Sequence, residues 1–232
     1  MRYFTGGEKY GGHKMRLIDT FKPNRLSQIV GNRAAIDRIE RAVDQNDGFG
    51  GLVIMLTGKT GNGKTLIADL IADMIDGELY RPDCTKDAET AVFIDQMKQD
   101  ISTRFMFSAQ SVYILDEADK LSPDNIAKLK TTIDAIDRKR QQNLPCHVTV
   151  IFTSAKKKEQ LSDAQKKHWD ELTTRCIRCE VGVTSDELNA YFAKMTRGKV
   201  KDMSRRLSAR YTVLSMRAAW DYIDEHDIGI TG

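Results

Sequence analysis

Short apolar runs alternate along the chain with stretches in which apolar residues recur every three or four positions. Three runs are typical of strands buried on both faces of a sheet: LVIML at 52–56, SVYIL at 111–115 and HVTVIF at 147–152. The intervening stretches, among them 67–74, 88–106 and 122–136, have the spacing of helices. Strands that alternate with helices predict an α/β fold, with a parallel sheet covered by helices on both faces.

The pattern changes near the C-terminus, where only helical spacing remains. Thr184 and Glu187 have the spacing of a capping box at the start of a helix. Two further amphipathic stretches follow, at about 200–207 and 216–223. We therefore expect three small helices to form a bundle after the α/β part of the chain.

Length and composition suit one domain with a small appendage. We expect a flexible N-terminal segment at 1–14, an α/β domain at 15–182 and a helical domain at 183–232. No apolar run approaches the roughly 18 residues of a membrane span, and the start of the chain is glycine-rich and charged where a signal peptide is apolar. These features predict a cytoplasmic protein with no membrane partner.

Charge and cysteine content leave two questions open. The net charge is only +3, but basic residues cluster at 138–140, 156–158 and 197–206. These clusters would either contact DNA phosphates or lie on solvated faces. Of the four cysteines, only Cys176 and Cys179 are close in sequence. A lone CxxC is weak evidence for zinc, and reduced cysteines on a strand are the alternative.

A phosphate-binding loop is predicted between the first apolar run and the helix after it. The segment TGKTGNGKT at 57–65 has the GxxxxGK[ST] arrangement. Its glycines let backbone amides surround phosphate oxygens, Lys64 would reach the β and γ phosphates, and the Thr65 hydroxyl would bind Mg²⁺. The residues expected to bind a nucleotide are Gly58, Lys59, Thr60, Gly61, Asn62, Gly63, Lys64, Thr65 and Leu66.

Two carboxylates end the second apolar run, in YILDEAD at 113–119. Asp116 is placed to hold Mg²⁺ through water, and Glu117 to orient and deprotonate the attacking water. Two solvated acids at a strand end are the alternative. The letters DEAD also occur in a class of helicases, but those need two tandem motor domains and this chain has length for one.

Four further segments carry a family resemblance: FKPNRLSQIVGN at 21–32, LDEADKLSPDNIAKLKTTID at 115–134, TTRC at 173–176 and SMRAAWDYI at 215–223. Together with the phosphate loop and in this order, they resemble the AAA+ ATPases, and among these the clamp-loader subunits of the replication factor C type. The resemblance implies an AAA+ P-loop NTPase core followed by a small three-helix lid.

The resemblance also implies residue roles. Arg175 would be an arginine finger that enters the ATP site of the adjacent subunit, and Arg217 a lid arginine that senses the γ-phosphate. Val30 and Gly31 would border the adenine. The helix after Ser122 would face DNA, bound through its phosphates. The FMF segment at 105–107 would be either a sliding-clamp contact or core.

Three departures from the family pattern stand out. Ala155 occupies the position of the first sensor, where asparagine is common, so Thr153 or Ser154 would take that role. Residues 156–174 form a longer connection than usual, and 138–145 also resemble an insertion. The sequence ends after the lid segment and has no counterpart of the family's helical collar domain. We expect either a truncated form of such a subunit or a compact relative of the family.

The resemblance implies an ATPase that uses ATP and Mg²⁺ at subunit interfaces to load a sliding clamp on primer–template DNA. Its partners would be the clamp and other clamp-loader subunits, in a homo- or hetero-oligomer, with a pentamer among the options. Three alternatives remain: a helicase loader or transposition regulator that forms ATP-bound filaments on DNA, a non-hydrolysing nucleotide-binding scaffold subunit, and a metal-binding protein that uses the CxxC.

Overall fold

The computed structural model describes residues 16–46, 48, 50–102, 110–156, 158–211 and 214–231. It also places the backbone of three two-residue strands, β1 (Tyr3–Phe4), β2 (Lys9–Tyr10) and β3 (His13–Lys14). The FMF segment at 105–107 lies outside the described residues. Within the described ranges, no helix is long and apolar enough to cross a membrane.

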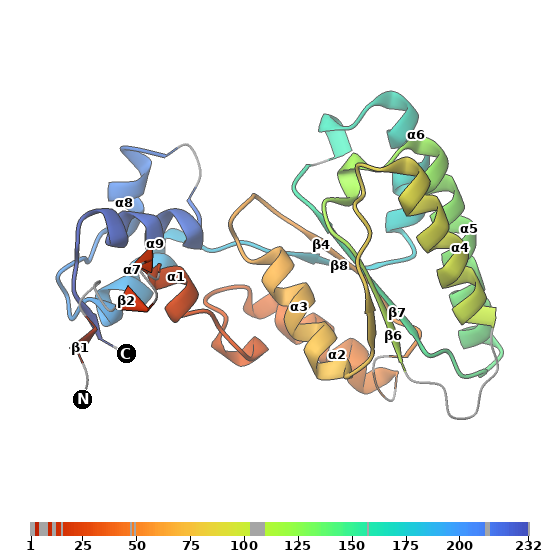
Figure 1. The fold of residues 1–232 in the computed structure, drawn as a ribbon, viewed down its shortest axis with the longest axis horizontal. Helices are drawn as coiled ribbons and strands as arrows, with labels where there is room; N and C mark the ends of the chain where they lie inside the picture. The colour runs from red at the N-terminus through yellow and green to blue at the C-terminus, as the bar shows by residue number, and fades with distance from the viewer. Residues whose placement is uncertain are drawn as a thin grey trace. The chain divides into compact units, whose positions relative to one another are not determined.

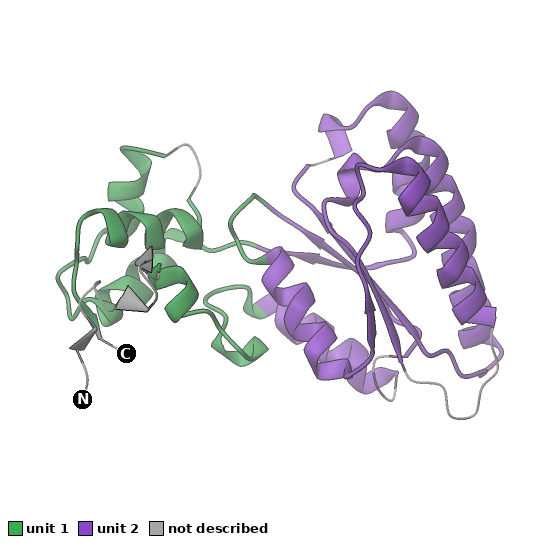
Figure 2. Ribbon diagram, in the orientation of Figure 1, with its two compact units in different colours: residues 1–33, 59–63, 182–232 green, residues 34–58, 64–181 purple. Residues whose placement is uncertain are grey.

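The chain divides into two compact units (Figure 2). Unit 1 contains residues 1–33, 59–63 and 182–232, and unit 2 contains residues 34–58 and 64–181. Residues 16–33, 59–63 and 182, which the sequence pattern assigns to the α/β domain, therefore group with the C-terminal helices. The domain boundaries drawn from the pattern stay a prediction.

Unit 2 is built on a five-stranded parallel sheet with the strand order β5-β6-β7-β4-β8. Its strands are β4 (Val53–Thr57), β5 (Glu78–Tyr80), β6 (Ser111–Leu115), β7 (Val148–Ser154) and β8 (Ile177–Glu180). The three predicted apolar runs form the three central strands, which are the ones buried on both faces. The α/β fold with a parallel sheet is confirmed.

The register of the central strands aligns their carboxyl ends. Leu56 of β4 lies opposite Thr153 of β7, and Leu115 of β6 lies opposite Phe152. The segments that follow these strands therefore leave the sheet at the same edge. This is the edge at which open α/β sheets bind their ligands.

Helices cover both faces of the sheet (Figure 1). On one face lie α2 (Arg33–Gln45) and α3 (Lys64–Ile75), and on the other lie α4 (Asp87–Ser102), α5 (Pro123–Gln141) and α6 (Asp163–Thr173). The helix α5 begins at Pro123, and the Ser122 side chain caps it by accepting a hydrogen bond from the backbone N–H of Asn125.

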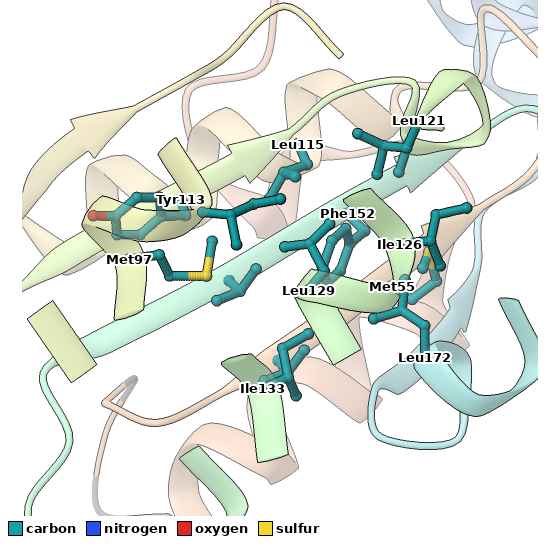
Figure 3. Close-up of a cluster of buried hydrophobic side chains, with 14 of the residues drawn as sticks. Met55, Met97, Tyr113, Leu115, Leu121, Ile126, Leu129, Ile133, Phe152 and Leu172 are labelled. Atoms are coloured by element: carbon teal, nitrogen blue, oxygen red, sulfur yellow. The ribbon is translucent and has the colours of Figure 1, made fainter. Parts of the chain in front are cut away.

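The core of unit 2 lies between the sheet and the layer of α4, α5 and α6 (Figure 3). Alternate strand residues face this layer, because successive side chains of a strand point to opposite faces. The buried side chains include Met55, Met97, Tyr113, Leu115, Leu121, Ile126, Leu129, Ile133, Phe152 and Leu172. The packing of these side chains fixes the carboxyl ends of the central strands, from which the segments of the candidate site leave the sheet.

The predicted long connection at 156–174 contains a helix. Ser162 caps α6 through a capping box with Gln165, and the buried face of α6 carries Trp169 and Leu172. The capping-box spacing was visible in the sequence. The short helix η2 (Ala118–Lys120) precedes α5, and η3 (Lys158–Gln160) precedes α6.

Unit 1 contains the expected three C-terminal helices, α7 (Ser185–Met195), α8 (Met203–Ser208) and α9 (Met216–Glu225). The short helix α1 (Leu17–Thr20) packs on them: the Leu17 N–H donates to the Asp224 carboxylate at 3.0 Å, and the Phe21 ring stacks on Trp220 with centroids 5.3 Å apart. The single turn η1 (Leu26–Gln28) follows α1, and β9 (Ile230–Thr231) pairs with β1.

Candidate nucleotide site

The phosphate loop leaves the sheet at the end of β4. Gly58 has a φ of 153°, and a Cβ on this residue would lie 2.0 Å from the Val181 carbonyl oxygen, so only glycine fits. Lys64 begins α3 and is only 8% exposed. Its Nζ donates to the Gly58 carbonyl at 2.8 Å, so the lysine side chain connects the end of the loop to its beginning.

Replacing Gly58 by alanine is expected to weaken ATP binding at least tenfold and to lower the melting temperature. The new Cβ meets backbone rather than a movable side chain, so the loop has to shift, and overpacking of this kind costs about 1–3 kcal/mol. Equilibrium ATP binding and thermal unfolding measure both effects. The control is Gly182→Ala, because a Cβ at Gly182 would meet nothing within 4 Å. Wild-type ATP affinity in the Gly58 variant would contradict this account of the loop.

The tip of the loop, Lys59–Gly63, belongs to unit 1 and contacts the start of α9. A Cβ on Gly61 would lie 2.8 Å from the Ser215 hydroxyl, and the Gly61 carbonyl accepts a hydrogen bond from the Arg217 N–H at 3.4 Å. Ser215 caps α9. Arg217 is exposed, and no side chain among the described residues binds its guanidinium. The loop tip and the predicted lid arginine are therefore adjacent.

Two features of the tip suit an anionic ligand. Gly61 and Gly63 have φ values of 83° and 90°, a conformation found in backbone nests that bind anions. Asn62 is buried, yet its side-chain oxygen has no hydrogen-bond partner within the part of the chain that the structure describes. A buried polar atom without a partner is costly, which fits a site that a ligand completes. The residues present therefore fit the phosphates of a nucleotide.

Four of the predicted site residues are connected by hydrogen bonds near the ends of β6 and β7. The Thr65 hydroxyl lies 3.1 and 3.2 Å from the two carboxylate oxygens of Asp116. The buried Thr153 hydroxyl donates to Asp116 and accepts from the Glu117 N–H at 2.9 Å. Thr153 thus fixes both the Asp116 carboxylate and the backbone of Glu117.

This group of oxygens fits Mg²⁺. Magnesium prefers oxygen ligands and is usually held by one or two carboxylates together with substrate phosphates and water. Thr65 and Asp116 supply a hydroxyl and a carboxylate side by side. The described residues contain no cluster of three or more metal-binding side chains, so phosphate oxygens and water would complete the ion's coordination.

The two acids that follow Asp116 have different surroundings. The Glu117 side chain is 57% exposed and pairs with Lys120. Asp119 is 4% exposed, accepts from the Ala155 N–H at 3.1 Å and lies 3.8 Å from the Lys156 ammonium. Glu117 is accessible to solvent, whereas Asp119 ties η2 to the loop after β7. The sequence pattern assigned no separate role to Asp119, although it is the last residue of the segment DEAD at 116–119.

Arg175 lies in the turn after α6 and is held by its own chain. Its guanidinium pairs with Asp134 of α5, with an Nη2–Oδ2 distance of 3.4 Å, and also donates to the Glu171 carbonyl. The hydrogen bond that the guanidinium donates to Asp134 raises the pKa of Arg175, so the group keeps its positive charge. Beside it, Lys130 pairs with Glu171 at 2.5 Å and lowers the pKa of that carboxyl. The sequence did not reveal the partners Asp134 and Glu171.

The predicted adenine border lies in unit 1. Gly31 has a φ of 65°, and a Cβ there would lie 3.0 Å from the Glu187 carboxylate. Next to it, the Asn32 side chain donates to the Val30 carbonyl at 3.2 Å and accepts from the Gly182 N–H at 2.6 Å. Asn32 thus holds the Val30–Gly31 turn beside the segment that leads into α7. Sequence reasoning had not assigned it this role.

All four cysteines are free thiols, of which Cys84 and Cys179 are buried and Cys146 and Cys176 partly buried. Burial raises the pKa of Cys176 and of Cys84 to about 12, and it also raises the pKa of Cys179. A thiol must lose its proton to bind zinc or to act as a nucleophile. No cluster of metal-binding side chains includes Cys176 or Cys179 in the described ranges.

Comparisons with known proteins show which proteins this chain resembles. Two replication factor C small subunits are similar to this chain. The subunit from Natronomonas pharaonis is 26% identical to it over 146 residues, and the subunit from Halobacterium salinarum is 24% identical to it over 143 residues. These matches cover 61% and 59% of this chain but only 44% and 43% of the relatives. The chain therefore spans less than half the length of either relative.

Solved structures and a family profile complete the comparison. Two structures of RuvB variants from Thermotoga maritima superpose with TM-scores of 0.52 and 0.51, at 14% and 15% identity, over 89% of this chain and 73% of each RuvB chain. At such identities they support the fold alone. A sequence profile described as "ATPase family associated with various cellular activities (AAA)" matches residues 54–176, from β4 to the turn that carries Arg175. Because this match covers more than half of the chain and includes the phosphate loop and its acidic partners, the chain belongs to the AAA family of ATPases.

Proposed function

We propose that the chain is a clamp-loader-type ATPase subunit, which hydrolyses ATP at a subunit interface to load a sliding clamp on primer–template DNA. The observation that carries the proposal is the hydrogen-bonded set of Thr65, Asp116, Thr153 and Glu117 beside the phosphate loop. The similarity to replication factor C small subunits supports the clamp-loader type.

The chain's own residues would divide the chemistry between them. Lys64 and the loop amides bind the phosphates, and Thr65 with Asp116 would hold Mg²⁺. A bound magnesium ion would neutralise charge on the β and γ phosphate oxygens. Glu117 is exposed and is our proposed base for the attacking water. Val30 and Gly31 would border the adenine.

Two arginines would complete the site. Arg175 would act in the site of an adjacent subunit, and Arg217 would connect α9 to the γ-phosphate. Because an arginine fork binds phosphate oxygens through two N–H groups, it suits both positions. DNA would be bound through its backbone, so its affinity should fall steeply with added salt.

A second candidate function is supported by the surroundings of Thr153. Its hydroxyl already bonds to Asp116 and to the Glu117 N–H, and the neighbouring Ala155 has no polar side chain. If no residue at the end of β7 contacts the γ-phosphate, hydrolysis is slow. The chain would then be a nucleotide-binding scaffold subunit.

ATP turnover per chain, measured against protein concentration with primer–template DNA present, tests the proposal. We expect turnover per chain to rise with concentration and to reach a plateau when the subunits have assembled, because each site needs an arginine from a neighbour. Sizing over the same range gives the state of assembly. Turnover that stays constant while subunits assemble would contradict a shared site. ATP binding without phosphate release, even with DNA, would favour the scaffold.

A further inference from the structure

Arg175 is held on two sides by groups of its own chain. Asp134 accepts from Nε and Nη2, which form the side edge of the guanidinium, and the Glu171 carbonyl accepts from Nη1. These bonds use three of the five N–H groups of an arginine. The other two, one on each terminal nitrogen, have no acceptor among the described residues.

A second ion pair lies beside the first. Lys130 and Asp134 are four residues apart on α5, and Glu171 and Arg175 are four residues apart across the end of α6. The Lys130–Glu171 and Asp134–Arg175 pairs therefore join the two helices, which lie side by side (Figure 1), at two consecutive turns. The first pair fixes the end of α6 against α5, and the second fixes the guanidinium.

The pairing orients the guanidinium without burying it. The side chains of Arg175 and Asp134 are 27% and 38% exposed. A free arginine samples many rotamers, and this freedom is lost when it grips a phosphate. An arginine already held by a carboxylate has lost much of that freedom within its own fold.

We propose that Asp134 is a positioning residue, which holds Arg175 so that its terminal nitrogens can reach the phosphates bound by a neighbouring copy of the chain. This inference rests on the proposed function. The opposite arrangement, in which Asp134 sequesters Arg175 and inhibits the site, predicts the opposite change in activity. A single experiment on mixed chains distinguishes the two.

The experiment mixes two variants that are each expected to be inactive. The acceptor chain carries Arg175→Ala and keeps its own base. The donor chain carries Glu117→Gln and keeps its arginine. If the finger acts between subunits, the mixture with primer–template DNA turns over ATP although neither variant does so alone. If the mixture stays inactive, the proposed function and this inference both fail.

The inference is tested by adding Asp134→Ala to one chain at a time. In the donor, it is expected to lower the restored turnover about tenfold, the scale set by freeing one arginine side chain. In the acceptor, which has no Arg175 to hold, the change should be less than twofold, and this result also shows that the variant folds. Unchanged or increased turnover with the altered donor would overturn the inference while leaving the proposed function intact.

Two further variants sharpen the test. Asp134→Asn keeps the shape of the side chain and removes its charge, so in the donor it should lower turnover in the same direction as alanine. Asp137→Ala is the matched control, because Asp137 lies on the same helix but pairs with Arg140, at 3.4 Å. It should change turnover less than twofold in the donor. An equal loss from Asp137→Ala would mean that general negative charge on α5, not the contact with Arg175, is responsible, and would overturn the inference.

Discussion

Replacing Arg175 by alanine is expected to lower ATP turnover about 10³-fold or more in the assembled protein, the lower end of the range for arginine fingers. ATP affinity of the isolated chain should stay within about threefold of wild type. The reason is that Arg175 is proposed to act on the nucleotide of a neighbouring chain, where it stabilises charge that develops on the phosphates. Turnover and ATP binding, each measured against protein concentration, separate the two effects.

The structure offers a matched control for this variant. Arg178 is exposed on β8, three residues further along the chain, so Arg178→Ala removes the same charge from the same region. Loss of the Arg175–Asp134 pair should cost little stability, since both side chains are partly exposed. Wild-type turnover by Arg175→Ala, at concentrations where it assembles, would assign Arg175 a structural role instead.

Much of the sheet was predictable because its central strands are buried on both faces. Such strands appear as continuous apolar runs, and β4, β6 and β7 each match one. The edge strand β5 has only three residues, and two of them, Glu78 and Leu79, are exposed. It has no apolar run to detect. Short edge strands are formed by pairing with a neighbour, which a local pattern does not record.

The candidate site was predictable where residues lie close to strand ends. Thr65, Asp116 and Thr153 come from three segments more than 35 residues apart, yet the parallel register brings their side chains together. A motif identifies such residues because each occupies a fixed position relative to its own strand. The arrangement agrees with the predicted positions, and the roles of these residues remain proposals.

Contacts between helices were not predictable in the same way. The Asp134–Arg175 pair and the bonds from Gln165 to the carbonyls of Asp119 and Leu121, at 3.1 and 2.8 Å, depend on how α6 packs against α5 and η2. Because α6 occupies what the sequence suggested was only a longer connection, its partners could not be named. Charged residues on a helix surface are compatible with many neighbours, and only the packed structure selects one.

Replacing Glu117 by glutamine is expected to preserve ATP binding and to lower turnover about 10²- to 10⁴-fold, the usual contribution of a general base. Glutamine has the same shape as glutamate but cannot accept a proton from water. The Glu117 backbone should stay in place, because its N–H is bound by Thr153 rather than by its own side chain. Lys120 would lose its charged partner, a small effect at an exposed pair.

Single-turnover kinetics with saturating ATP measure the chemical step directly, and Glu159→Gln, an exposed acid in η3, is the matched control. Unchanged turnover in the Glu117 variant would remove Glu117 as the base. Loss of both turnover and ATP binding would instead mean that the substitution disturbs the phosphate site. If binding persists and turnover is lost, the variant is also the inactive donor that the mixing experiment needs, since it keeps Arg175 and Asp134. The same substitution would then separate the two halves of a shared site: the base of one chain and the arginine of the next.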